Sequence, residues 1–105
     1  MKTGIFLQTS SMPLYEANTK ILVDFYRRMI SAMSLDMFVM PYIGDDTLKE
    51  DTYFDGDVLR VKCNDKNVKE KHRLLFNYIK NETDTDIILK TNVNIVVDLH
   101  FIKNV

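Results

Sequence analysis

The chain has 105 residues, of which 46% are hydrophobic, 10% aromatic and 28% charged, a composition typical of a small globular domain and not of disordered or fibrous chains. Fourteen lysines and arginines oppose fifteen aspartates and glutamates, which gives a formal net charge of −1. Because there is no excess of positive charge, the composition favours neither nucleic acid nor an anionic membrane as a partner. We therefore expect residues 1–105 to form a single domain that binds neither.

Cys63 is the only cysteine, so the chain cannot form an internal disulfide. The apolar run at residues 4–7 is too short for a signal peptide or a membrane span. Both features predict a cytoplasmic protein in a reducing compartment. Cys63 follows an apolar run and has no histidine nearby in the sequence, so we expect a buried thiol and not a nucleophile.

The N-terminal part predicts a strand, a helix and a second strand. Residues 4–9 form an apolar run that leads into a polar Thr-Ser-Ser cluster, as a buried strand ending in a loop would. Ser11 and Pro13 indicate a helix start, with the Ser11 hydroxyl capping a free backbone N–H. Residues 37–40 form the second strand, which Pro41 should end. The expected apolar face of the helix consists of Leu14, Ala17, Ile21, Phe25, Met29 and Met33.

The C-terminal part predicts an exposed connection, then a strand, a helix and a further strand. Residues 44–57 are acidic and end in an Asp55-Gly56 turn, and residues 58–61 form the third strand. Asn64 or Asp65 would cap the second helix, which ends near Asn81. Residues 86–90 form the fourth strand, and residues 95–99 are either a strand or the start of a helix. The residues expected to share a face of the second helix are Val68, His72, Leu75, Phe76 and Ile79.

The resulting order, β-α-β-β-α-β, fits two fold classes. The first is an α/β fold of three layers with a mainly parallel, four-stranded, Rossmann-like sheet. The second is an α+β ferredoxin-like fold, in which the second and third strands pair as an antiparallel hairpin. Continuous apolar runs such as Met37-Phe38-Val39-Met40 are typical of parallel strands covered on both faces. We therefore favour the α/β fold.

Residues 50–98 resemble the central part of the β-1,3-galactosyltransferase-like glycosyltransferases. The resemblance begins with Glu50 or Asp51, followed by Tyr53-Phe54-Asp55-Gly56-Asp57-Val58-Leu59. It continues with Asp65, a helix that carries Lys71, and a strand that ends in Leu89-Lys90-Thr91 before the apolar segment Ile95-Val96-Val97. The resemblance implies a GT-A fold that binds a nucleotide-diphospho-sugar, with a donor pocket formed by the ends of the first and fourth strands.

The sequence departs from that family where the family binds its metal ion. In the family, the Lys-Thr pair leads into the aspartates of the DxD element, which hold a divalent cation between the donor phosphates. Asn92-Val93-Asn94 stand there in this chain. An amide oxygen offers a dipole but no charge, so Asn92 and Asn94 would hold Mn²⁺ or Mg²⁺ only weakly, and no cofactor is assigned.

The chain ends about ten residues beyond this element, before the position at which the family's acceptor-binding half would follow. We therefore expect the donor-binding part of a transferase, without turnover and with no identifiable catalytic residue. The candidate residues for donor binding are Thr9, Ser10, Ser11, Asp65, Lys71, Asn92 and Asn94. Each has a structural alternative: helix capping for the hydroxyls, a solvated charged face for Lys71, and turn formation for the asparagines.

The alternative function is a small, non-catalytic protein-interaction module. Six acids in the connection, Asp45, Asp46, Glu50, Asp51, Asp55 and Asp57, could face a basic partner or simply water. The abundance of Lys, Asn, Ile and Asp is typical of AT-rich viral or mobile genomes. An uncovered sheet edge or face makes self-association a further expectation.

His72 and His100 show no zinc spacing, and we expect His72 to be packed with one bonded nitrogen.

Overall fold

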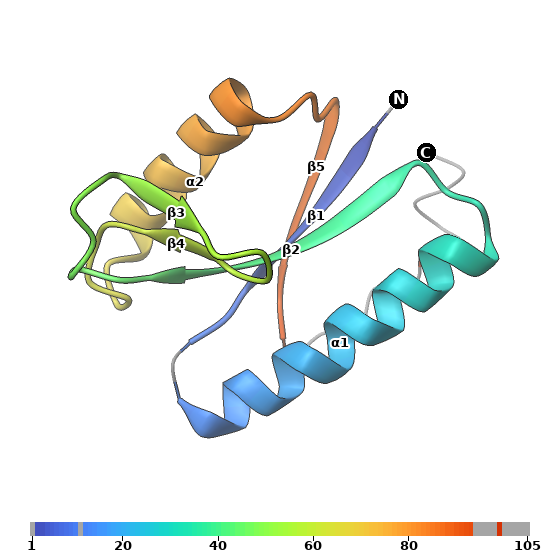
Figure 1. The fold of residues 1–105 in the computed structure, drawn as a ribbon, viewed down its shortest axis with the longest axis horizontal. Helices are drawn as coiled ribbons and strands as arrows, with labels where there is room; N and C mark the ends of the chain where they lie inside the picture. Colours follow the sequence, from blue (N-terminus) through green and yellow to red (C-terminus); the bar gives the residue numbers. More distant parts are fainter. Residues whose placement is uncertain (1, 11, 94–98, 100–105) are drawn as a thin grey trace.

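A five-stranded mixed sheet with two helices forms the fold. The computed structural model describes residues 2–10, 12–93 and 99. The elements in chain order are β1 (Thr3–Gln8), α1 (Pro13–Ala32), β2 (Met37–Gly44), β3 (Thr52–Phe54), β4 (Leu59–Val61), α2 (Val68–Glu82) and β5 (Ile87–Asn92) (Figure 1). Of the segment at residues 95–99, only Leu99 lies within the described residues, and it is buried.

The strand order is β3-β4-β2-β1-β5. The pairs β1–β2, β1–β5 and β2–β4 are parallel, and only β3 runs antiparallel, to β4. The α/β class is therefore confirmed, whereas the ferredoxin-like alternative is wrong, because it needs β2 and β4 to be antiparallel. The expected count of four strands is also wrong, because β3 forms in the segment that we interpreted as an exposed connection.

The turn at Asp55 and Gly56 explains this extra strand. Gly56 has φ = +100°, a backbone conformation open to glycine, and the Asp55 carboxylate accepts the N–H groups of Asp57 and Val58 at 2.9 and 2.8 Å. The chain therefore reverses sharply enough for Thr52–Phe54 to pair with β4.

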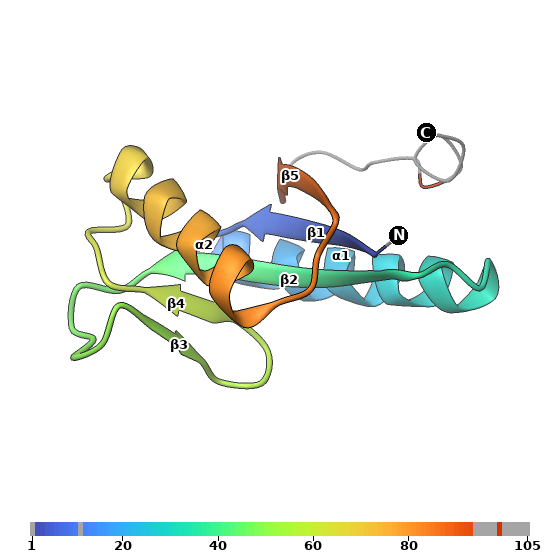
Figure 2. The same cartoon turned by 90° about the horizontal axis from the view of Figure 1, so that it is seen from above.

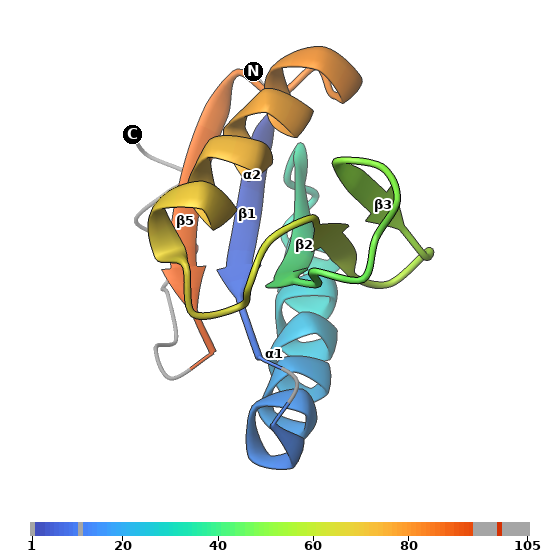
Figure 3. The same cartoon turned by 90° about the vertical axis from the view of Figure 1, so that its left-hand side faces the viewer.

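The two helices cover opposite faces of the sheet, which gives three layers (Figures 2 and 3). Successive side chains of a strand point to opposite faces. Ile5 and Leu7 of β1 accordingly lie in the cluster formed with Leu22 and Tyr26 of α1. Phe6 lies in the other cluster, with Leu74, Leu75 and Ile79 of α2. The continuous apolar runs of the sequence are thus those of strands buried on both faces.

Pro41 does not end the second strand, contrary to the prediction. Backbone groups point alternately to the two neighbouring strands, and the Tyr42 carbonyl accepts from Thr9 on the β1 side. The backbone nitrogen of Pro41 therefore points towards β4. The pairing of β4 with β2 begins only one residue later, with Tyr42 opposite Leu59. The missing N–H of the proline removes no hydrogen bond from the ladder, so the strand continues.

Helix α1 packs on the sheet with a face that matches the predicted one only in part. Its buried residues are Thr19, Leu22 and Tyr26, whereas Leu14 and Ile21 are 69% and 67% exposed. The helix carries two apolar stripes: Leu14, Ile21 and Phe25 of the predicted face belong to the exposed one, whereas Met29 and Met33 pack against the core with Leu22 and Tyr26. Periodicity identified the helix but could not decide which stripe the sheet covers.

Both helices begin at other capping residues than expected. Met12 occupies the N-cap of α1 and makes no side-chain cap hydrogen bond, while Pro13 begins the helix as predicted; Ser11 lies outside the described residues. Asn67 caps α2 by accepting the Glu70 N–H, in place of Asn64 or Asp65. Asp65 has a different role, described below.

The C-terminus of α1 leads to a stability prediction at Ser34. The N–H of Ser34 bonds to the Ser31 carbonyl, and the N–H of Leu35 bonds to the Ile30 carbonyl, as in a Schellman motif. Ser34 has φ = +52°, which costs an L-residue free energy. Ser34→Gly should therefore raise the free energy of unfolding by about 0.5–1 kcal/mol, seen as a higher urea midpoint with an unchanged slope. Ser31→Gly, inside the helix, should lower it, and a decrease for both would contradict this explanation.

Candidate functional site

The carboxyl ends of β1 and β5 lie side by side at one edge of the sheet. The two strands pair in parallel with Gln8 opposite Asn92, although 84 positions separate the paired residues. The strand order also reverses at β1, since β2 and β4 lie on its other side. Ligands of open parallel sheets bind outside the carboxyl ends of the strands at such a reversal. This edge is therefore the candidate site.

At this edge, the buried Lys71 of α2 and its partner Asp65 contact the ends of three strands. Lys71 Nζ lies 2.6 Å from Asp65 Oδ1 and donates to the Thr9 carbonyl at 3.2 Å. Asp65 Oδ1 also accepts the Gly44 N–H at 2.8 Å. Thr9 follows β1, Gly44 ends β2 and Asp65 follows β4, so this Lys71–Asp65 pair fixes the strand ends relative to one another.

The burial of Lys71 overturns its interpretation as part of a solvated charged face. The side chain is 1% exposed and lies on the inner face of α2 with Leu75 and Ile79, at spacings of four. This spacing from Leu75 and Ile79 could have indicated from the sequence that Lys71 lies on the buried face. The neighbouring charges at Lys69 and Arg73 favoured an exposed face instead. An ammonium group has three donors, and those of Lys71 reach Thr9 O, Asp65 O and Asp65 Oδ1, which leaves none for a phosphate.

A second polar cluster next to the Lys71–Asp65 pair joins β1, β2 and α2. His72 Nε2 lies 3.1 Å from both the Tyr42 hydroxyl and Gln8 Oε1. Burial raises the pKa of the Tyr42 phenol, so this group stays protonated. His72 is thus packed with one bonded nitrogen, as predicted, whereas Gln8 and Tyr42 carried no signal in the sequence that marks them as its partners.

His72 should make the stability of the protein depend on pH. Partial burial, and then the charges of Lys90 and Lys71, lower its pKa below the ordinary 6.5. Because the unfolded chain then binds the proton more tightly, the free energy of unfolding should fall as the pH drops below about 6.5 and level off under the folded pKa. Urea unfolding at about pH 7.5 and about pH 5.5 measures this loss, which His72→Gln should reduce. Equal losses in both proteins would contradict it, since His100 is present in each.

A groove of about 650 Å³ lies on the α1 side of the sheet, between α1 and the β3–β4 turn. Thr9 and Ser10 form part of its wall, and Pro41 and Ile43 of β2 line it as well. Its volume is within the range of small-molecule sites. The charged residues of its wall are Lys20, Arg27 and Arg60 with Glu16, Asp24, Asp55 and Asp57. Within the described part of the chain, Arg27 is the one of these cations without an ion pair.

The hydroxyl of Thr9 is engaged in holding α1 to the sheet. It lies 2.5 Å from the Thr19 hydroxyl, which in turn donates to the Tyr15 carbonyl. Ser10 lines the groove, and Asn92 is half-buried at the end of β5. Of the other donor-binding candidates, Ser11 and Asn94 lie outside the described residues.

Arg60 forms ion pairs with two of the six acids of the connection. It lies 3.4 Å from Asp45 and 3.6 Å from Asp55. Hydrogen bonds from Thr47 are the main cause that lowers the pKa of Asp45, and those from Val58 and Asp57 lower the pKa of Asp55. These two acids therefore stabilise the hairpin. The acids that remain exposed without such a role are Asp46, Glu50, Asp51 and Asp57.

The described residues contain no group of three or more histidine, cysteine or acidic side chains placed to hold a metal ion. Cys63 is buried, and desolvation raises the pKa of its thiol, which fits the expected unreactive cysteine. Neither described helix is long and apolar enough to cross a membrane.

In comparisons with known proteins, no family model, no curated protein and no solved structure matches this chain.

Proposed function

We propose that the chain binds the nucleoside diphosphate of a nucleotide sugar at the carboxyl edge of β1 and β5, as the donor-binding part of a GT-A-like glycosyltransferase, without transferring the sugar. The observation that carries the proposal is the parallel pairing of β1 and β5. It brings Ser10 and Asn92, two donor-binding candidates from opposite ends of the sequence, to the edge where the strand order reverses.

The groove beside this edge supplies suitable chemistry for such a ligand. Ser10 offers a hydroxyl, and Arg27 offers a guanidinium that can bind phosphate oxygens through two parallel N–H groups. Pro41, Ile43 and Val58 give the groove an apolar part against which a base or a sugar ring can pack. Lys71 is assigned to position the strand ends and not to touch the ligand.

The proposed binding does not depend on a metal ion. Asn92 and Asn94 stand where the glycosyltransferase family that the sequence resembles has carboxylates, and amides bind hard cations weakly. Turnover would also need a general base and a counter-charge for the leaving diphosphate. Asp65, which contacts the strand ends, is engaged by Lys71 and Gly44 and is therefore unsuited to act as the base.

Titration calorimetry with UDP and UDP-sugars, in Mn²⁺ and in EDTA, tests this proposal. We expect binding in both buffers with dissociation constants within about twofold of each other, since no carboxylate holds the ion. Ser10→Glu places a negative charge against the diphosphate and should weaken binding at least about tenfold. Ser31→Glu, at the other end of α1, is the matched control. An absence of heat for every nucleotide would overturn the proposal.

A further variant tests the role assigned to the asparagines. Asn92→Asp combined with Asn94→Asp restores two carboxylates, which Mn²⁺ prefers as ligands. We expect this double variant to bind UDP more tightly in Mn²⁺ than in EDTA. Equal affinities in the two buffers would show that these positions do not lie at the diphosphate.

A protein-interaction function is the second candidate, favoured by the exposed surface of the β3 hairpin. Tyr53 and Phe54 are both exposed there, next to the exposed Asp51 and Asp57. Aromatic side chains with acids around them suit a basic protein surface. Tyr53→Ser combined with Asp51→Asn should abolish capture of such a partner, while unchanged capture would exclude this surface.

A further inference from the structure

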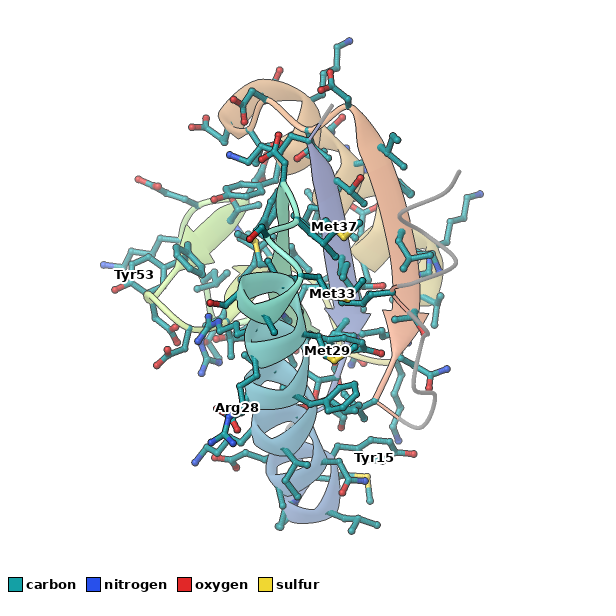
Figure 4. All side chains as sticks on the ribbon, turned by 90° about the vertical axis from the view of Figure 1, so that its right-hand side faces the viewer. Tyr15, Arg28, Met29, Met33, Met37 and Tyr53 are labelled. Atoms are coloured by element: carbon teal, nitrogen blue, oxygen red, sulfur yellow. The ribbon has the colours of Figure 1, made fainter. Side chains whose placement is uncertain are left out.

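Helix α1 presents an apolar stripe on its outer side that no described element covers. Leu14, Ile21 and Phe25 are exposed on this stripe, while the helix packs on the sheet through Leu22 and Tyr26. Arg28 lies on this stripe and forms an ion pair with Asp24 of the same helix at 2.9 Å, and Figure 4 shows it projecting away from the side on which Met29 and Met33 lie. Exposed apolar residues gathered on one helix face indicate an interaction surface.

The spacing along this stripe is that of a helix–helix seam. Spacings of four and three residues alternate, which gives the 3.5-residue period at which two helices keep the same faces in contact. The seam residues in order are Leu14, Asn18, Ile21, Phe25, Arg28 and Ala32. Two of the six are polar, Asn18 and Arg28, and such residues at a seam select the register and the orientation of the partner.

We propose that this seam binds α1 of a second copy of the chain in antiparallel orientation. A two-fold axis midway between Ile21 and Phe25 places Ile21 opposite the partner's Phe25 and Leu14 opposite the partner's Ala32. The same axis places Asn18 opposite the partner's Arg28, so the amide oxygen of one helix can accept from the guanidinium of the other. Every apolar seam residue thereby meets an apolar one, and every polar residue meets a polar one.

The parallel orientation lacks this complementarity. It would place Arg28, which is paired with Asp24 of its own helix, beside the partner's Arg28, and Asn18 beside the partner's Asn18, so neither guanidinium would gain the amide oxygen of the other helix as an acceptor. The dipoles of the two helices would also be parallel, whereas in the antiparallel pair they oppose and stabilise each other. The hydrogen bond between Asn18 and Arg28 and the opposed helix dipoles therefore favour the antiparallel pair.

The size of the seam predicts a weak dimer. The 20 residues of α1 extend about 30 Å, and a contact strip about 10 Å wide covers only about 300 Å² of each copy. Stable interfaces bury about 800 Å² on each partner. Association should therefore be reversible and depend on concentration.

Sedimentation analysis over a series of protein concentrations tests the dimer with two matched variants. Phe25 and Phe76 are 40% and 42% exposed, on α1 and α2 respectively. The natural chain and Phe76→Glu should both rise from 12.3 kDa towards twice that mass, while Phe25→Glu should stay at 12.3 kDa throughout. Ile21→Glu, at a more exposed position, repeats the test should Phe25→Glu fail to fold. A natural chain that stays monomeric, as it would if the seam bound a different helix, overturns the proposal.

Disulfide trapping tests the orientation. Leu14→Cys and Ala32→Cys are oxidised separately and as an equal mixture, with Cys63 buried and unreactive. The antiparallel pair predicts a disulfide only between the two different variants. A disulfide between two chains of Leu14→Cys, formed at the same rate as the mixed one, would overturn the proposed register.

Discussion

Lys71→Ala is expected to lower the free energy of unfolding by about 3–5 kcal/mol, the largest effect of any single charged residue in the described structure. The Lys71 ammonium is buried and contacts Asp65 and the Thr9 carbonyl. Its removal leaves the Asp65 carboxylate at the strand ends without its counter-charge and leaves a cavity beneath α2. Since small domains have a total stability of about 5–15 kcal/mol, urea unfolding should detect a large shift of the midpoint.

Lys69→Ala is the matched control, because Lys69 lies on the exposed side of the same helix and should change the stability by less than about 0.5 kcal/mol. Asp65→Asn keeps the acceptor for Gly44 but removes the charge. Combined with Lys71→Met, it should be less destabilising than the sum of the two single changes. A loss below about 1 kcal/mol for Lys71→Ala would show that the pair does not hold the strand ends.

Gly44→Ala is expected to destabilise the protein by about 3 kcal/mol, at the upper end of the range for overpacking. A Cβ atom at Gly44 would lie 2.7 Å from Asp65 Cα and 3.1 Å from the Cys63 carbonyl oxygen. Both are backbone atoms of the connection between β4 and α2, so no side-chain rotation can relieve the contact. The added methyl group would push β2 away from that connection and disturb the Gly44–Asp65 hydrogen bond.

Gly56→Ala provides the contrast. A Cβ atom there meets nothing within 4 Å, and only the positive φ of +100° opposes the change. We expect a loss of about 1 kcal/mol, from backbone strain alone. Thermal or urea unfolding of both variants separates the two causes, and a Gly44→Ala variant as stable as Gly56→Ala would contradict the close approach described here.

The strands and helices could largely be predicted from the sequence, because apolar runs and helical periodicity depend on nearby residues. The parallel pairing of β2 and β4 also followed, since continuous apolar runs indicate burial on both faces. The inner face of α1 and the continuation of β2 through Pro41 could not be predicted in this way. Both depend on which strand lies alongside, which local patterns do not contain.

The candidate site, too, could be predicted only in part from the sequence. The resemblance to glycosyltransferases implied a donor pocket formed by the ends of the first and fourth strands. The ends of β1 and β5 do lie side by side, but the groove is lined by Thr9 and Ser10 and by no residue of β5. The burial of Lys71 and the partners of His72 were not predicted. They arise because α2 rotates a charged residue inward, where Asp65 and Thr9 can satisfy it, and only the assembled strand ends provide those partners.

The strand order also has a consequence for how the chain is made. Beyond the β1–β5 pairing, the Lys2 N–H bonds to Asp86, 84 positions later. During synthesis, β1 therefore keeps one side unpaired until residue 92 has left the ribosome, although β2 is already available on its other side. Such an open edge can pair with another nascent chain. Slow translation of the segment before β5 would prolong this exposure, and chaperone binding to nascent chains should be strongest in that interval.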